Sequence, residues 1–367
     1  MFNKRVPVLN PDGSPAMPTK ASRARRWVRD SKAKVVQNDL GVFCVQLIEE
    51  STGRNTQDIS LGIDPGSCFT GVAVQSKRNT LIGLNLNLPK KQVQKRLAER
   101  AVLRRTRRGR RIKRSLPFKK RNHRQKRFDN RRQPKLPPSI RANKQLELRV
   151  VDELRCLYPI THAIVERLNK SDSPGFTVAA QGQTFLIKEL EKRLRVTLVQ
   201  GWETEATREW LKLPKSKNKG EQTPAAHVSD AIAQAARHFI RYAASTTGLQ
   251  TGYQWKGVIQ VTPFTFGIVE RLPSRPRKMH DLTLQKDGVR DTYGGFDGTH
   301  SFKNGDYVEY KTKRSILKGY ISANDLYQFF PNKKRLKQGV ADKNTRLLRY
   351  SSHLIVNLHS DAAFLSR

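Results

Sequence analysis

The stretch LGIDPGSCFTGVAVQ, residues 61–75, joins two apolar runs through Asp64, Pro65 and Gly66. Apolar runs bounded by turn-forming residues predict strands, and TLIGLNLNL at 80–88 predicts another. Strands joined by such short turns indicate an antiparallel meander. A buried carboxylate is costly unless it is partnered or binds a metal, although an acid at a strand end usually faces solvent. The question is therefore which role Asp64 has.

Composition indicates a folded protein that works on a polyanion. The chain has 367 residues, 37% of them hydrophobic, which is enough for two or three domains with their own cores. Lysine and arginine total 71 against 31 acidic residues, giving a formal net charge of +40. A compact protein with this charge repels itself strongly unless a polyanion accompanies it. We therefore expect nucleic acid as the partner.

Cysteine spacing and hydropathy indicate the cellular compartment of the protein. Cys44, Cys68 and Cys156 are scattered without a C-x-x-C pair, so neither a disulfide framework nor a zinc ribbon is supported. No apolar run approaches the ~18–20 residues of a membrane span, and the N-terminus lacks a signal-peptide core. We expect a protein of a reducing cytoplasm with no membrane partner.

Residues 1–57 predict a small α/β module. A strand at 6–9 and a turn are followed by a short basic helix at 21–31. This helix carries Arg23, Arg25 and Arg26, which often form only a solvated face in such a setting. The net charge of the chain favours phosphate contacts for them instead.

Residues 90–133 form the most basic segment, with 21 lysines or arginines and only Glu99 and Asp129 as acids. The pattern predicts a helix to about residue 115, which Pro117 ends, followed by a basic linker to Pro138. Like charges four residues apart repel one another, and the segment has too little apolar surface for a core. We expect this helix to need phosphates for its stability.

From residue 139 onward, helical and strand patterns alternate. Helices are predicted at 140–159, 185–194, 204–213 with Thr204 as its cap, and 224–243; strands are predicted at 161–169 and 195–201. After residue 250, frequent aromatics, glycines and short apolar runs predict a small β-barrel.

Three acids share a placement in this pattern. Asp64, Glu166 and Asp230 each stand on or beside an apolar run, although any one of them alone is more often solvent-facing. Together they offer hard oxygen ligands from separate elements, which two Mg²⁺ ions about 4 Å apart require at a phosphodiester.

His227 stands three residues before Asp230, so a helix would present both side chains on one face. A lone histidine on a helix is usually structural. Beside a metal-binding acid, it is also placed to activate a water or to orient the phosphate.

The order of these motifs resembles a known group of nucleases. GIDPGS…TGVAV, AIVERLN and HVSDAIAQA are similar to the three split motifs of a RuvC-type nuclease with an RNase H-like fold, and RRTRR at 104–108 resembles the arginine-rich bridge helix of transposon-encoded RNA-guided nucleases. The opening residues resemble the N-terminal module of IscB and IsrB proteins named for Pro-Leu-Met-Pro, with Ala16 in place of the leucine. The resemblance covers residues 5–245.

Absent features indicate which member of the group the chain resembles. IscB and type II CRISPR effectors carry an HNH nuclease between the second and third motifs, yet no histidine lies between His162 and His227. TnpB relatives usually carry late cysteine-paired zinc ribbons, and no cysteine follows Cys156. The resemblance therefore points to the IsrB family of RuvC-only nickases.

The resemblance implies an effector that binds a long guide (omega) RNA and opens double-stranded DNA beside a short flanking motif. Its RuvC site would nick the displaced non-target strand, with Asp64, Glu166 and Asp230 binding two Mg²⁺ ions, for which Mn²⁺ substitutes, and His227 assisting. The protein would be a monomer in its ribonucleoprotein, in a prokaryotic cytoplasm and associated with the nucleoid through DNA.

The expected fold class is α/β, an RNase H-like core split by an arginine-rich bridge helix. The expected parts are an N-terminal module at 1–57, RuvC part I at 58–89, the bridge helix and linker at 90–138, RuvC parts II and III at 139–250, and a β-rich domain at 251–367 that reads the flanking motif. The arginines expected to hold RNA and heteroduplex through phosphates are Arg96, Arg100, Arg104, Arg105, Arg107, Arg108, Arg110, Arg111 and Arg114.

Two other functions fit the charge. A catalytically silent RNA-binding scaffold would bind RNA without nicking DNA, but it would have no physical reason to keep the acid set. An RNA-independent junction-resolving nuclease would cut branched DNA without any guide.

Overall fold

The computed structural model describes residues 5–50, 53–110, 115–120, 136–167, 178–218, 220–247, 250–271, 302, 306–321, 326–329, 339–349 and 354–362. The helices are α1 (Ala21–Arg29), α2 (Lys90–Arg110), α3 (Pro138–Leu157), α4 (Val178–Glu191), α5 (Gly201–Trp210) and α6 (Ser229–Ala236), with a π-helical turn at Pro224–Val228 and 3-10 turns at Phe118–Lys120 and Asp342–Asn344. None of the helices in the described part of the chain is long and apolar enough to cross a membrane.

The strands follow the order of the chain. They are β1 (Arg5–Leu9), β2 (Pro15–Lys20), β3 (Ala33–Val36), β4 (Cys44–Leu47), β5 (Ile59–Pro65), β6 (Phe69–Ser76), β7 (Thr80–Asn87), β8 (His162–Glu166), β9 (Arg195–Val199), β10 (Ile240–Thr247), β11 (Gln250–Gly257), β12 (Phe264–Arg271), β13 (Tyr307–Tyr310), β14 (Lys313–Ile321), β15 (Leu326–Phe329), β16 (Arg346–Arg349) and β17 (Leu354–Ala362).

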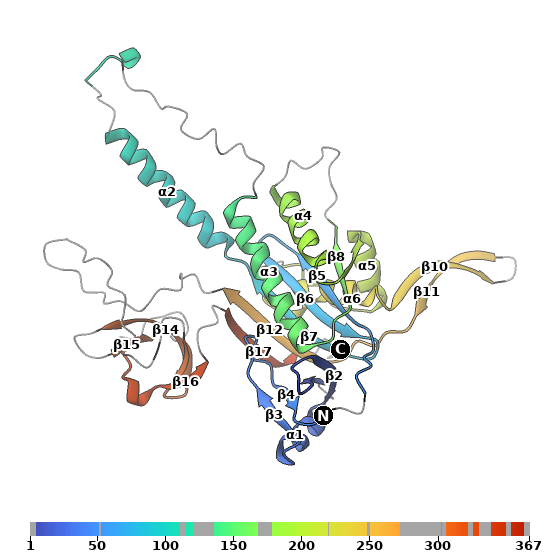
Figure 1. The fold of residues 1–367 in the computed structure, drawn as a ribbon. Coiled ribbons are helices and arrows are strands. Elements are labelled where there is room, and N and C mark those ends of the chain that lie inside the picture. The colour runs from blue at the N-terminus through green and yellow to red at the C-terminus, as the bar shows by residue number, and fades with distance from the viewer. Residues whose placement is uncertain are drawn as a thin grey trace. The chain divides into compact units, whose positions relative to one another are not determined.

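A seven-stranded mixed sheet carries the candidate site. Its strand order is β17-β12-β7-β6-β5-β8-β9 (Figure 1). Strands β5, β6 and β7 form the predicted antiparallel meander, which is confirmed, while β8 and β9 run parallel to β5. Helices connect the parallel strands, as parallel pairing requires. The fold is mixed α/β.

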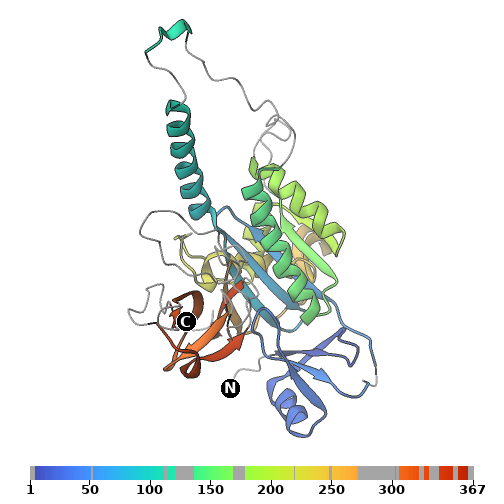
Figure 2. The same ribbon diagram turned by 60° about the vertical axis from the view of Figure 1, so that its left-hand side comes forward.

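Side chains of the central strands alternate between two helical layers. Ser60 Oγ donates to the Ala235 carbonyl of α6 at 2.8 Å, whereas Thr70 Oγ1 donates to Glu147 of α3 at 2.8 Å. Because successive residues of a strand point to opposite faces, α6 covers one face of the sheet and α3 the other. Figures 1 and 2 show helices on both sides of these strands.

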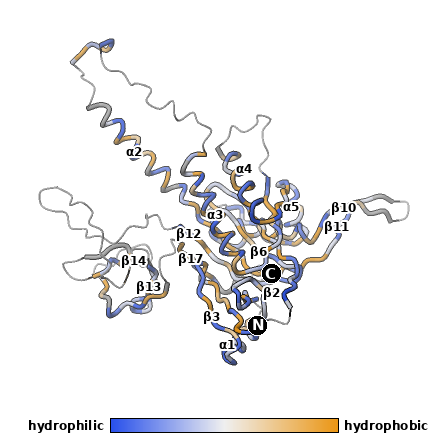
Figure 3. Tube along the Cα trace, viewed as in Figure 1, coloured by the Kyte–Doolittle hydropathy of each residue, from blue (hydrophilic) through white to orange (hydrophobic). Residues whose placement is uncertain are grey.

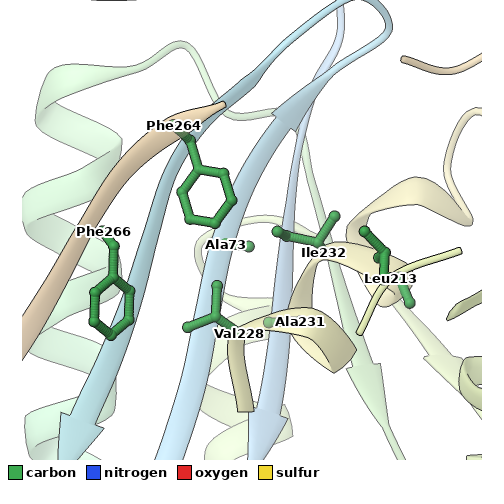
Figure 4. Close-up of a cluster of buried hydrophobic side chains, with 8 residues drawn as sticks. Ala73, Leu213, Val228, Ala231, Ile232, Phe264 and Phe266 are labelled. Atoms are coloured by element: carbon green, nitrogen blue, oxygen red, sulfur yellow. The ribbon is translucent and has the colours of Figure 1, made fainter. Parts of the chain in front are cut away.

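A buried cluster ties α6 to the sheet. Val228, Ala231 and Ile232 pack against Ala73 of β6 and against Phe264 and Phe266 of β12 (Figure 4). Burying a phenylalanine side chain contributes about 1.5–3 kcal/mol, so β12 is held to this sheet by packing as well as by pairing with β7.

The N-terminal residues form a separate small core. Strands in the order β2-β1-β4-β3 carry α1, whose buried Ala24 packs with Val6, Val8 and Val45. The hydropathy colouring in Figure 3 shows α1 as mostly hydrophilic, because four of its nine residues are arginines.

Helix α2 lacks a core of its own. Leu97, Val102 and Leu103 are 48%, 57% and 59% exposed, and hydrophilic and hydrophobic colours alternate along the helix in Figure 3. The sequence predicted a helix here with too little apolar surface for a core. The structure gives the helix from Lys90 to Arg110.

Residues 271–355 form a second compact unit, and residues 1–270 with 356–367 form the first. The second unit contains a sheet in the order β15-β14-β13-β16 around Val308, Leu317 and Phe329. This arrangement is β-rich, as predicted. The expected boundary at 251 differs from the observed division, because β12 and β17 join the sheet of the first unit.

Two local predictions are wrong. The helix predicted at 224–243 ends with α6 at Ala236, and residues from Ile240 pair in the β10–β11 hairpin instead. Thr204 is not a cap, since it lies inside α5, whose cap is Gln200 with a reciprocal Glu203 contact at 2.8 Å. The first error arises because pairing with β11 overrides the local helical pattern, and the second because a capping box places the start of the helix four residues earlier.

Candidate active site

Asp64 and Glu166 lie at the same end of two neighbouring parallel strands. Ile63 of β5 pairs with Val165 of β8, so the next position along each strand is Asp64 and Glu166. Parallel strands in register bring such residues to the same edge of the sheet. The two carboxylates thus become neighbours although about a hundred residues separate them in the chain.

Two glycines let the third motif approach these strands. A Cβ on Gly62 would overlap the Ala231 carbonyl oxygen, and one on Gly71 would overlap that of His227. Only a residue without a side chain allows such close contact between helix backbone and strand. Gly62 and Gly71 therefore let α6 and the π-helical turn before it lie directly on β5 and β6.

His227 and Asp230 come from the junction between two helical forms. His227 lies in the π-helical turn, and Asp230 lies in the first turn of α6. His227 Nδ1 is 3.2 Å from Asp64 Oδ2, and its ring stacks on Phe69 with centroids 5.7 Å apart. A π-turn changes the phase of a helix, and such turns are frequent at functional sites.

A cavity of about 580 Å³ contains all four residues that the sequence singled out. Asp64, Glu166, His227 and Asp230 line it together with Lys215 and the loop that follows β5. The structure therefore brings together residues from four separate parts of the chain. The ligand atoms of these residues are spread over the cavity, since no three of Asp64, Glu166, His227 and Asp230, all described in the structure, have ligand atoms within 4.8 Å of one another.

The electrostatics differ between the acids. Burial, followed by the negative charge of Asp64, raises the pKa of Glu166, while Thr204 and Gln234 oppose this through hydrogen bonds. Gln234 Nε2 donates to Glu166 Oε2 at 3.4 Å. The neighbouring carboxylates thus repel each other, and a cation between them would relieve that repulsion.

Asp230 is neutralised by basic side chains. Arg208 Nη1 donates to its Oδ1 at 2.8 Å, and Lys215 Nζ contacts its Oδ2. Both of its oxygens therefore have a cationic partner. A divalent metal bound to Asp230 would share these oxygens with the two cations or displace one of them.

The oxygen-rich donor set fits a hard divalent cation. Asp64, Glu166 and Asp230 supply carboxylates, which Mg²⁺ and Mn²⁺ prefer over softer ligands. The raised pKa of Glu166 is a second reason to expect a cation here, because it reflects burial and the nearby negative charge of Asp64. These residues would hold the metal.

Sequence reasoning missed Lys215 and Arg208, because neither lies in a motif whose spacing points to the cavity. It also missed a buried pair behind β6, in which Lys144 Nζ donates to Glu147 at 2.9 Å. Burial raises the pKa of Glu147, and Asp64 adds to this shift. The signal in the sequence was a lysine and an acid three residues apart beside the inward-facing Leu146 and Val150.

The arginines expected to contact phosphates divide into three groups. Arg100, Arg104 and Arg105 are exposed on α2, and Arg23, Arg25 and Arg26 are exposed on α1. Arg96, Arg107, Arg108 and Arg110 lie in α2, but their side chains are outside the described part, as are Arg111 and Arg114 entirely. The described arginines therefore present their charge to solvent.

A family model described as RRXRR protein matches residues 6–173. This chain is similar to that family over the matched range. The range includes Asp64, Glu166 and the Arg-Arg-Thr-Arg-Arg sequence at 104–108.

Two solved structures of RuvC are also similar to part of the chain. RuvC of T. thermophilus in complex with a Holliday junction substrate is 14% identical with a TM-score of 0.29, covering 50% of this chain and 92% of RuvC. A second Thermus thermophilus RuvC structure is 14% identical with a TM-score of 0.27, covering 49% of this chain and 92% of RuvC. No curated protein matches the sequence.

Proposed function

We propose that this chain is a guide-RNA-directed DNA endonuclease of the IsrB type, with an RNase H-like RuvC core that nicks the displaced non-target strand. The observation that carries the proposal is the cavity lined by Asp64, Glu166, His227 and Asp230. The mixed sheet supports it, because a meander followed by parallel strands brings the first two acids together. The match to the RRXRR proteins over 6–173 supports it independently.

The proposed chemistry is hydrolysis of a phosphodiester. Bound Mg²⁺ would stabilise the charge on the phosphate and lower the pKa of the attacking water. Asp64, Glu166 and Asp230 would hold the metal, and the contact with Asp64 would fix the orientation of the His227 ring for contact with a phosphate or a water. Lys215 also lines the cavity, where its ammonium group suits a phosphate oxygen.

The proposed RNA contacts lie on α2. Its exposed arginines and its half-exposed leucines suit a surface that a nucleic acid covers. A helix of this length spans about 30 Å, which is close to one turn of a duplex. We assign to α2 and its linker, residues 90–138, the role of a bridge helix that contacts phosphates and leaves sequence choice to base pairing.

We also propose roles for the N-terminal module and the C-terminal region. We propose that the N-terminal module contributes phosphate contacts through α1, and that the β-rich C-terminal region reads the flanking DNA motif. The chain would act as a monomer with a long guide RNA in a prokaryotic cytoplasm.

The decisive experiment combines purified protein, its copurifying RNA and supercoiled plasmid carrying the matching target, with and without Mg²⁺. We expect Mg²⁺-dependent nicking of the non-target strand that stops when the RNA is digested. Glu191→Gln is a matched control for substitutions of the cavity acids, because Glu191 is an exposed acid on α4 that does not line the cavity.

Two outcomes contradict the proposal. Tight RNA binding without any nicking would indicate the silent scaffold. Cutting of branched DNA that survives ribonuclease treatment would indicate the junction-resolving nuclease.

A further inference from the structure

The strands and helix that carry the candidate active site also bring a second group of side chains together at their opposite ends. Asp58 precedes β5, His162 begins β8 and His238 follows α6. Asp64, Glu166 and Asp230 lie at the other ends of the same three elements. Asp58 and Asp64 are six residues apart on an extended chain, which corresponds to about 20 Å. The two groups are therefore distinct.

The ligand atoms of this second group converge. One atom from each of Asp58, His162 and His238 lies within 4.8 Å of the other two. His238 Nε2 is 3.2 Å from Asp58 Oδ2, and the two imidazole rings have centroids 4.0 Å apart. With metal–ligand bonds of about 2.0 Å, neighbouring ligand atoms around a tetrahedral ion lie about 3.3 Å apart. The 3.2 Å between His238 Nε2 and Asp58 Oδ2 therefore suits two ligand atoms of one such ion.

A neighbouring hydroxyl contacts His162. Thr161 Oγ1 lies 3.2 Å from the Ile59 carbonyl and 2.9 Å from His162 Nδ1, so a hydroxyl that donates to the carbonyl accepts a hydrogen from Nδ1. This arrangement leaves Nε2 of His162 as the ring nitrogen with a lone pair. Metal-binding histidines generally donate their other ring nitrogen in this way.

One member of the group faces solvent. Asp58 is 58% exposed at its side chain, so an ion could enter from solvent on that side.

We propose that Asp58, His162 and His238 form a binding site for a borderline transition-metal ion of the Zn²⁺ class. Two imidazoles with one carboxylate favour such an ion over Mg²⁺, which prefers oxygen ligands. The ion ties the start of β5, the start of β8 and the end of α6 together. Its effect is to stabilise the sheet from the side remote from the cavity, whether or not the chain cuts DNA.

The test titrates the full-length chain, stripped of metal with a chelator and freed of RNA, with Co²⁺ in excess Mg²⁺. Co²⁺ replaces Zn²⁺ and absorbs visible light in a tetrahedral site, while the Mg²⁺ competes for the oxygen ligands of the cavity. We expect a single tetrahedral Co²⁺ per chain, which Zn²⁺ displaces. Zn²⁺ should also raise the Tm of the chain, because it binds only the folded state.

Matched variants locate the ion. Asp58→Asn and His238→Gln should each weaken Co²⁺ binding at least about tenfold, and Thr161→Val should weaken it by a similar factor by removing the partner of His162. Asp64→Asn and Glu191→Gln should leave the absorption unchanged. Asp58→Asn is exposed and isosteric, so it keeps the test valid if a histidine variant fails to fold.

Three results would overturn the proposal. The first is a wild-type chain without tetrahedral Co²⁺, in which case Asp58 and His238 form only a hydrogen bond. The second is a spectrum that persists in Asp58→Asn and His238→Gln. The third is a spectrum lost in Asp64→Asn, which would place the ion in the cavity.

Discussion

The central sheet and helix α2 differ in how they obtain their structure. Strands β5, β6 and β7 are buried along almost their whole length, with Ile63 and Leu84 fully covered. Leu97 and Val102 of α2 are about half exposed. The sheet thus has a core of its own, whereas α2 leaves its described apolar side chains exposed. We propose that stability and nucleic-acid binding belong to different segments, which substitutions should separate.

The largest effect is expected at Asp64, in the proposed catalytic site. Asp64→Asn keeps the shape of the side chain but removes a ligand charge worth several kcal/mol in the transition state, so nicking should fall on the order of 10³-fold. RNA binding through α2 should be unchanged. A nicking assay beside an RNA-binding assay measures both, and wild-type nicking would remove Asp64 from the site.

The next effect concerns the packing of the sheet. Gly71→Ala places a Cβ against the His227 carbonyl and should destabilise the fold by about 3 kcal/mol. Gly252→Ala is the control, since nothing lies within 4 Å of the added Cβ there. Denaturant unfolding of both variants compares them, and equal stability would mean that α6 does not rest on β6 as described.

Substitutions in helix α2 should change RNA binding and leave the stability of the fold nearly unchanged. Replacing Arg104, Arg105, Arg107 and Arg108 with Gln removes four cations, so the slope of log K against log salt for RNA should decrease by about 3. The free energy of unfolding should change by less than about 0.5 kcal/mol, as is usual for surface positions. Lysine replacements at the same positions should largely retain the slope. An unchanged slope in the glutamine variant would show that α2 faces solvent in the complex.

The smallest effect is a pH-dependent change in stability at Glu166. Because its pKa is raised in the folded protein, the folded state holds a proton more tightly than the unfolded one, and stability is lost as pH rises from the unfolded pKa through the folded pKa. Glu166→Gln removes this loss. In the metal-free protein its Tm should therefore fall less than that of wild type between acidic and neutral pH, and parallel Tm curves would contradict the raised pKa.

The meander and much of the α/β alternation could be predicted because local patterns determine them. The run around Asp64 is apolar on both sides, and the helix at 140–159 repeats Leu146, Val150 and Leu154 on one face, all of which are buried. The grouping of Asp64, Glu166, His227 and Asp230 was expected from their placement and from family resemblance; the cavity is consistent with it, while their catalytic role remains a prediction.

Other features depend on contacts between distant residues. Nothing near Ile240 indicates that it leaves a helical pattern to pair with Gly257. The neutralisation of Asp230 by Arg208 and Lys215 depends on how α5 and the loop after it pack beside α6. The sequence shows these side chains but not which acid they reach.

The place of β17 at the edge of the seven-stranded sheet affects how the chain is made. Residues 271–355 form an excursion between two strands of one sheet, so a ribosome must synthesise all of these residues before that sheet has its last strand. Until then β12 has an open edge that invites pairing with other chains. Truncation at the C-terminus should accordingly promote aggregation of the nascent protein.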